Sequence, residues 1–232
     1  PVNFDGLDDN LSTTQDGATG VDTNLTTHAG FIYVTSQPIG PQTAFDSTDA
    51  FPGTLWREID ADIPGTSGFR LRFYHAWSGV KGEWRTTSDL NAAQWYQFAI
   101  TYDASSTTNN PTIFIDNISV AVTTVQTPTG TRNTGYDSVR LGEDETGVQA
   151  FNGMLAFVCL DAGVLWSSAQ RNRFYWYGHP GGEIELAYPL ITNDYTNKGT
   201  VTTANLTAHN GPITVSAITH APKGFVLLRS CT

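Results

Sequence analysis

Three carboxylates alternate along one short segment of this sequence. Glu58, Asp60 and Asp62 are separated by single residues, and a β-strand here would place all three on one face, because successive side chains of a strand point to opposite faces. Closely spaced carboxyl pairs can cleave a glycosidic bond, one acting as acid and the other as nucleophile or base. The following residues 63–65 (Ile-Pro-Gly) read as a turn that ends the strand early. We therefore expect these carboxylates to be solvated and too far apart for catalysis.

A second group of acidic residues lies in predicted turns. Asp5, Asp8 and Asp144, with their neighbours Asp9 and Glu145, offer the hard oxygen atoms that calcium prefers. Their spacing is not that of an EF-hand, so a site would have to combine distant loops. Asp in a turn also accepts hydrogen bonds from its own backbone. The sequence leaves calcium binding and turn chemistry open, and it calls for no other cofactor.

Aromatic side chains are the third candidate. Trp77, Trp84, Tyr175 and Trp176 could present rings to a sugar or to another protein. Large aromatic side chains also dominate protein cores, so burial is the alternative for each of them.

Several functional classes are excluded by composition. The formal net charge is −10, which argues against a nucleic-acid partner because phosphate backbones require Lys and Arg. No apolar run is long enough to span a bilayer. The five His residues show no zinc-ligand spacing, and nucleophile-elbow, P-loop and dinucleotide motifs are absent. Of the two cysteines, Cys159 lies in an apolar run and reads as a reduced core residue, while a disulfide with Cys231 stays open.

The elements that must position these groups are short strands. Apolar or alternating runs recur between clusters of Gly, Pro, Asn and Asp, which is typical of a sandwich or barrel. The helix predicted over 165–175 is short, and Ser167 and Gln170 have the spacing of a capping box. The runs expected as strands are 30–36, 54–59, 69–75, 95–102, 112–122, 138–141, 154–160, 184–190 and 213–218.

Three ordered segments resemble laminin-G-like domains. Residues 3–11 are similar to the family's opening F-D-G-x-D-D-Y-L strand and turn, residues 95–103 with 111–117 to its central hairpin, and residues 139–144 with 151–155 to its l-x-i-G…F-x-G-x-I pair. The resemblance implies one all-β domain over 1–232: a two-sheet antiparallel jelly-roll sandwich, concanavalin A-like, with one short helix. Residues 186–211 resemble a strand and loop that usually precede the F-D-G segment, which leaves the topology of 183–232 open.

The central hairpin supports this fold independently. Tyr96, Phe98, Ile100 and Tyr102 share one apolar strand face, so we expect them inside, together with the large side chains Phe114 and Phe157. Asn117 suits the turn of the hairpin, because Asn tolerates the left-handed conformation that such turns require.

The segment that carries Glu58, Asp60 and Asp62 also resembles a known enzyme family. Residues 58–62 are similar to the E-x-D-x-E strand of jelly-roll glucanases. That resemblance would make Glu58 the nucleophile, Asp60 the residue that tunes it, and the last carboxylate the acid/base. Here Asp62 replaces Glu and is one methylene shorter. We therefore predict no catalysis.

Three functions follow in order of preference. The first is a non-enzymatic structural protein of a virion surface, such as a phage capsid decoration or head-fibre protein, with capsid proteins or further copies of itself as partners. Its grounds are a chain that begins directly at the fold without a leader, free cysteines and an acidic surface rich in Thr, Gly and Asn. The second is a carbohydrate-binding, lectin-like module of a secreted or surface protein. The third is a β-glucanase.

Overall fold

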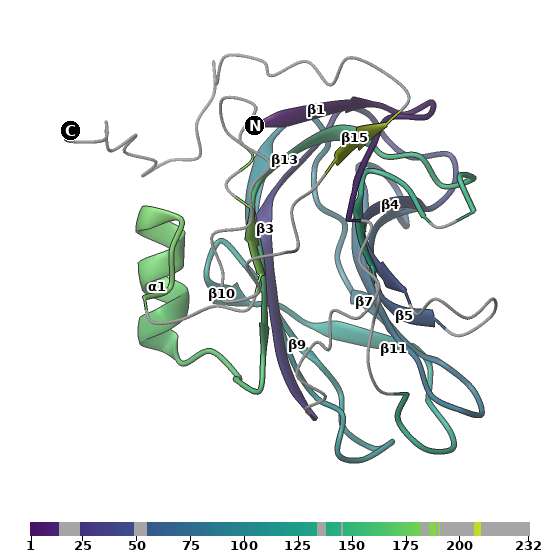
Figure 1. Cartoon of the computed structure of the whole chain (residues 1–232), viewed down its shortest axis with the longest axis vertical. Coiled ribbons are helices and arrows are strands. Elements are labelled where there is room, and N and C mark those ends of the chain that lie inside the picture. Colours follow the sequence, from purple (N-terminus) through teal and green to yellow (C-terminus); the bar gives the residue numbers. More distant parts are fainter. Residues whose placement is uncertain are drawn as a thin grey trace.

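The computed structural model describes residues 1–13, 24–48, 55–133, 138–144, 146–181, 186–188, 190 and 207–209. Two curved antiparallel sheets face each other, and one helix lies outside the first of them (Figure 1). In sheet A the strand order is β1 (Val2–Asp5), β13 (Asn152–Ala162), β3 (Leu25–Val34), β8 (Trp95–Asp103), β9 (Thr112–Ile115) and β10 (Ile118–Ser119), and β14 (Leu186–Tyr188) also pairs with β13. In sheet B the order is β11 (Val122–Gln126), β7 (Gly82–Thr86), β6 (Arg70–His75), β5 (Leu55–Asp62), β4 (Gln42–Thr48), β12 (Ser138–Leu141), β2 (Asn10–Ser12) and β15 (Thr207–His209). The predicted jelly-roll sandwich is confirmed.

The main core lies between the two sheets. On β8, Tyr96, Phe98, Ile100 and Tyr102 all face it, as their alternation predicts. In sheet B, every second side chain along a strand points into the same core, as Phe73 does on β6. Deep burial of these large side chains supplies most of the favourable free energy of folding.

A second, smaller core lies on the opposite face of sheet A. Helix α1 (Ser168–Tyr177) covers this face, and Phe174 is fully buried against it. Ser167 caps the helix through the predicted capping box with Gln170. Cys159 is buried here as a free thiol, which confirms its prediction as a core residue, whereas Cys231 lies outside the described residues.

Phe157 belongs to this outer face rather than to the space between the sheets. The register of β13 shifts between Ala156 and Cys159, and Phe157 takes a positive φ of 50° in the resulting bulge. It is partly buried and packs against the smaller core. Strict alternation from the sequence places it incorrectly because a bulge changes the face on which a side chain lies.

One strand boundary agrees with the sequence-based expectation, and other strands differ from it. β5 does end at Asp62, just before the predicted turn. The run expected as one strand over 112–122 is divided, because the Asp116–Asn117 turn reverses the chain between β9 and β10 and the chain then crosses to sheet B. Strands β2, β4, β7 and β15 are not among the runs expected above, whereas β1 lies in the segment that resembles an opening strand.

The C-terminal strands return to the N-terminal ones. β14 pairs with β13 on the edge that also holds β1, and β15 pairs with β2. The expected run 213–218 lies outside the described residues.

Candidate functional site

The carboxylates of β5 lie on the face of sheet B that points away from the main core. Glu58, Asp60 and Asp62 alternate with Ile59 and Ala61, which face the other sheet. Contrary to the expectation that they are solvated, all three are buried, and Asp60 has no exposed surface. The prediction was wrong because periodicity assigns side chains to a face but does not show whether that face is covered.

Asp60 and Asp62 are held by arginines from the next two strands. Arg72 on β6 stands opposite Asp60 in the strand register, and its Nε donates a hydrogen bond to Asp60 Oδ2 at 3.0 Å. Asp62 lies between Arg72 (Nη1 to Oδ1, 3.5 Å) and Arg85 of β7 (Nη1 to Oδ2, 3.3 Å). A buried carboxylate needs such a partner, since losing the counter-charge leaves it uncompensated. Sequence reasoning missed both arginines, because only the pairing of β5, β6 and β7 brings them to this face.

Glu58 has a different environment. Its Oε1 accepts a hydrogen bond from the Thr43 hydroxyl at 3.0 Å, and Asp46 stands opposite it in the register. Burial raises the pKa of Glu58 far above its ordinary value, and the negative charge and hydrogen bond of Asp60 and the charge of Asp46 raise it further. Glu58 is therefore protonated at neutral pH and donates to the Asp60 carboxylate. The pair therefore consists of a neutral Glu58 acid beside Asp60, which is bonded to Arg72.

Tyr74 borders this group on β6. The Arg72 guanidinium lies 4.5 Å and the Lys81 ammonium 3.8 Å from the centre of its ring, distances typical of cation–π contacts. Burial raises the pKa of the Tyr74 hydroxyl. The whole group is thus a packed polar layer in which Asp60 and Asp62 have cationic partners.

Two of the four predicted ligand-binding aromatics belong to the core. Trp77 is 7% exposed and Trp84 has no exposed surface. Trp84 stacks on Phe73, and its indole N–H donates to Asn110 Oδ1 at 2.8 Å. The prediction that these two tryptophans present rings to a ligand was wrong, because both side chains fill space between the sheets.

The other two aromatics lie on helix α1. Trp176 is 46% exposed, and Tyr175 is partly exposed with its ring edge-on to Trp176 at 5.1 Å. The Trp176 indole N–H donates to Asn172 Oδ1 at 3.2 Å, as the i, i+4 spacing allows. The Asn117 amide, from the β9–β10 turn, donates to the same oxygen at 3.4 Å. The structure thus joins an exposed aromatic pair to two amide side chains that sequence reasoning did not assign to it.

The turn that carries Asn117 is rigidly built. Asp116 and Asn117 have positive φ values of 49° and 62°, as expected for a tight hairpin turn. Gln97 on β8 holds this turn through two hydrogen bonds. Its backbone N–H donates to Asp116 Oδ1, and its side-chain oxygen accepts from the Asn117 backbone N–H. Within the described residues, the buried Asn117 side-chain oxygen accepts no hydrogen bond.

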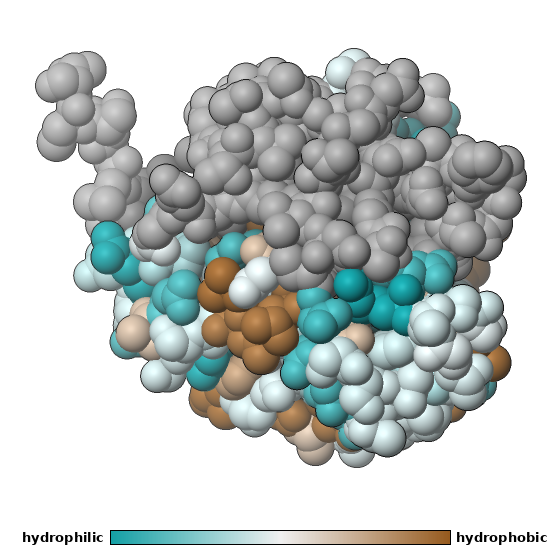
Figure 2. All heavy atoms as spheres, turned by 60° about the horizontal axis from the view of Figure 1, so that its bottom comes forward, coloured by the Kyte–Doolittle hydropathy of each residue, from teal (hydrophilic) through white to brown (hydrophobic). Residues whose placement is uncertain are grey.

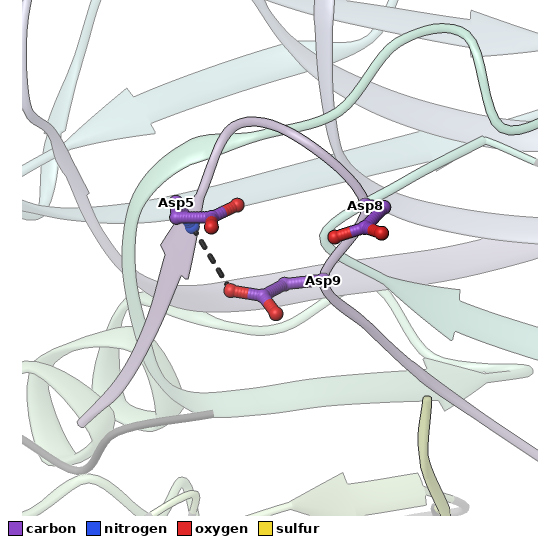
Figure 3. Close-up of side chains that lie close together, drawn as sticks. All are labelled: Asp5, Asp8 and Asp9. Atoms are coloured by element: carbon purple, nitrogen blue, oxygen red, sulfur yellow. Dashed lines mark hydrogen bonds between the residues drawn. The ribbon is translucent and has the colours of Figure 1, made fainter. Parts of the chain in front are cut away.

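The predicted metal ligands are only partly brought together. Asp5, Asp8 and Asp9 gather in the β1–β2 turn, with carboxylate oxygens within 4.8 Å of one another (Figure 3). Two of them also serve the turn itself: Asp9 accepts from the Asp5 backbone at 3.1 Å, and Asp5 accepts from the Leu7 backbone at 2.8 Å. Burial raises the pKa of Asp9. The predicted turn chemistry is therefore confirmed for Asp5 and Asp9, while calcium binding at the three carboxylates stays a prediction.

Asp144 does not join this cluster, which corrects its prediction as a metal ligand. Its carboxylate accepts hydrogen bonds from the Thr146 hydroxyl and from the Val148 and Gln149 backbones. Burial opposes ionisation of Asp144, but these hydrogen bonds outweigh it and lower its pKa. Asp144 organises its own loop, and Glu145 lies outside the described residues.

The described surface at the end of the sandwich opposite the β1–β2 turn is mostly neutral or hydrophilic, with a hydrophobic area near the centre of the view and smaller ones along its edge (Figure 2). The ten-residue helix α1 is too short and too polar to cross a membrane, and the described part of the chain has no other helix.

The two-sheet fold agrees with the protein family that the sequence matches. The family model of the concanavalin A-like lectin/glucanases superfamily matches residues 5–169, and the chain belongs to this superfamily. A comparison with curated proteins by sequence finds no match.

Solved structures share the fold at low sequence identity. A candidate carbohydrate-binding protein from Bacteroides ovatus is 17% identical with a TM-score of 0.60, over 90% of this chain and 57% of its own. A heptameric SAP-like pentraxin from Limulus polyphemus is 11% identical with a TM-score of 0.62, over 90% and 91%. Domains LG4-5 of the mouse laminin α1 chain are 10% identical with a TM-score of 0.51, over 69% and 41%. The chain thus spans little more than half of the Bacteroides protein.

Proposed function

We propose that this protein is a carbohydrate-binding, lectin-like module of a secreted or surface protein. The observation that carries the proposal is the exposed Trp176 ring on α1 with the Asn172 and Asn117 amides beside it. Sugar rings stack their apolar faces on aromatic side chains, while amides bond their hydroxyl groups. Membership of the lectin/glucanase superfamily and the likeness to the Bacteroides protein support the same class.

We further propose that the module binds glycans without hydrolysing them. Asp60 and Asp62 are engaged by Arg72 and Arg85, and the Glu58 proton is directed to Asp60 rather than to solvent. Carboxylates committed to these contacts act as part of the packed layer. The expected result with laminarin or lichenan is no reducing sugar above that of the Glu58→Gln variant; hydrolysis that the variant loses would favour a glucanase.

Glycan-array binding tests the module directly. We expect Trp176→Ala to weaken binding about tenfold, the effect of losing one stacking contact. Ile39→Ala is the matched control, because Ile39 is fully exposed in the loop between β3 and β4. An array on which the wild type binds no glycan would contradict the proposal, and equal binding by both variants would place the site elsewhere.

The virion-surface role expected first from the sequence stays a prediction. It would be supported by capsid-bound protein in purified particles, whereas glycan binding by the isolated chain supports the lectin-like function.

A further inference from the structure

The sequence contains four Asn-x-Ser/Thr segments, the acceptor motif for N-linked glycans. The motif requires an accessible Asn amide and a hydroxyl group two residues further on. The four asparagines are Asn10, Asn24, Asn117 and Asn205, of which Asn205 lies outside the described residues. The fold distinguishes among the other three by what each side chain contacts.

Two of these asparagines are engaged in contacts. Asn10 is buried, and its amide donates a hydrogen bond to Glu143 Oε2 at 2.6 Å. Asn117 is partly buried in the β9–β10 turn, where its amide donates to Asn172 Oδ1. Asn24 differs, because its side chain is exposed just before β3 begins and makes no hydrogen bond to another described residue. A glycan on Asn24 can therefore extend into solvent without displacing a described contact.

The hydroxyl group that completes the Asn24 motif has no structural use. Thr26 is 1% exposed on β3 and faces the main core, on the same side of the strand as His28 and Ile32. Its Oγ1 is buried without a hydrogen-bond partner. Burial of an unpaired hydroxyl group destabilises a fold, and Val fills nearly the same space without that cost.

The adjacent Thr27 shows the usual arrangement. Its Oγ1 accepts from the Trp166 backbone N–H at 3.0 Å and donates to the Val164 carbonyl at 2.7 Å. Two consecutive threonines of β3 thus differ. The Thr27 hydroxyl holds the loop before α1, whereas the Thr26 hydroxyl matches only the acceptor motif. A buried polar group without a partner needs an explanation outside the packing.

We propose that Asn24 is an N-glycosylation site and that the Thr26 hydroxyl serves the glycan transfer rather than the fold. The donor is an oligosaccharide carried on a lipid pyrophosphate. Asn24 Nδ2 attacks the anomeric carbon, and the new C–N bond replaces the bond from that carbon to a phosphate oxygen. The lipid pyrophosphate leaves, and Nδ2 loses one proton. Thr26 is buried once β3 pairs with β8 and β13, so transfer precedes folding.

Secretion of the chain from cultured animal cells behind a signal peptide tests the site. This inference rests on the secreted location in the proposed function and not on its glycan site. We expect peptide N-glycosidase to convert Asn24 to Asp, as read by mass spectrometry, in the wild type and in Thr26→Ser but not in Thr26→Val. Thr27→Val is the matched control, because it leaves the motif intact and keeps the glycan. A secreted wild type with unmodified Asn24 overturns the proposal.

The melting temperature of chains made in bacteria that lack this transferase gives a second readout. Thr26→Val should leave it unchanged or raise it by up to about 2–4 °C, because an unpaired buried hydroxyl is removed. Thr27→Val should lower it through the loss of two hydrogen bonds. If Thr26→Val lowers it as well, the hydroxyl is structural and the proposal fails. Glycan-array binding by the same bacterial wild type tests the proposed function separately, since this protein carries no N-linked sugar.

Discussion

Replacing Glu58 by Gln tests the electrostatics of the buried polar layer. Gln has the shape of a protonated Glu, so it can still donate to Asp60 and accept from the Thr43 hydroxyl. It cannot ionise. The substitution therefore removes the titration of one group and leaves the packing of β5 in place.

The magnitude follows from linkage. Because the pKa of Glu58 is raised in the folded state, folding holds a proton that the unfolded chain releases above the ordinary value of 4.5. The stability of the wild type is then complete below pH 4.5 and is lost as pH rises toward the folded-state pKa. At about 1.4 kcal/mol per pH unit, the two and a half units between 4.5 and neutrality amount to about 3 kcal/mol.

Urea unfolding of the wild type and Glu58→Gln from pH 4 to pH 7 measures this loss. We expect the variant to gain up to about 3 kcal/mol on the wild type as pH rises across this range, with little difference at the acidic end. Other titrating groups are common to both proteins and cancel in the difference. Asp8→Asn is the control, because Asp8 is an exposed carboxylate.

A constant difference between wild type and Glu58→Gln at every pH would refute the reasoning, since it would mean that Glu58 has the same pKa in both states. A variant that loses stability as pH rises would show that Glu58 is ionised in the folded protein and needs its charge.

Three further predictions concern other parts of the fold. Asp89 accepts hydrogen bonds from the backbone of residues 65–67 and from Arg70, which lower its pKa; we expect Asp89→Ala to cost about 1–2 kcal/mol at neutral pH. The folded-state pKa is lowered, so this cost should shrink as pH falls from the ordinary Asp value toward the lower folded-state pKa, and an equal cost at pH 2 and pH 7 in urea titrations would contradict it. Phe98→Ala should cost about 3–5 kcal/mol, because Phe98 is 2% exposed in the main core; a loss below about 1 kcal/mol in denaturant would disprove that role. If calcium binds at the β1–β2 turn, adding calcium should raise the melting temperature of the wild type but not that of Asp8→Asn. A wild-type melting temperature that calcium does not change in calorimetry would show that these carboxylates serve only the hydrogen bonds of the turn.

The sequence by itself determines the class of fold and several local structures. Alternation on β8 identifies the face that enters the core, since strand geometry allows no other division of these side chains. The capping box of Ser167 and Gln170 and the turn at Asp116–Asn117 are equally local, because they depend on hydrogen bonds and backbone angles within a few residues.

Tertiary structure alone decides what surrounds each candidate side chain. Glu58, Asp60 and Asp62 share a face by periodicity, but their burial and the arginines opposite them depend on strand pairing. Trp84 and Trp176 are the same residue type, and only packing puts one in the core and the other on the surface. The physical reason is the same in each case: burial, ion pairing and pKa shifts are set by neighbours in space, which lie on strands far apart in the chain.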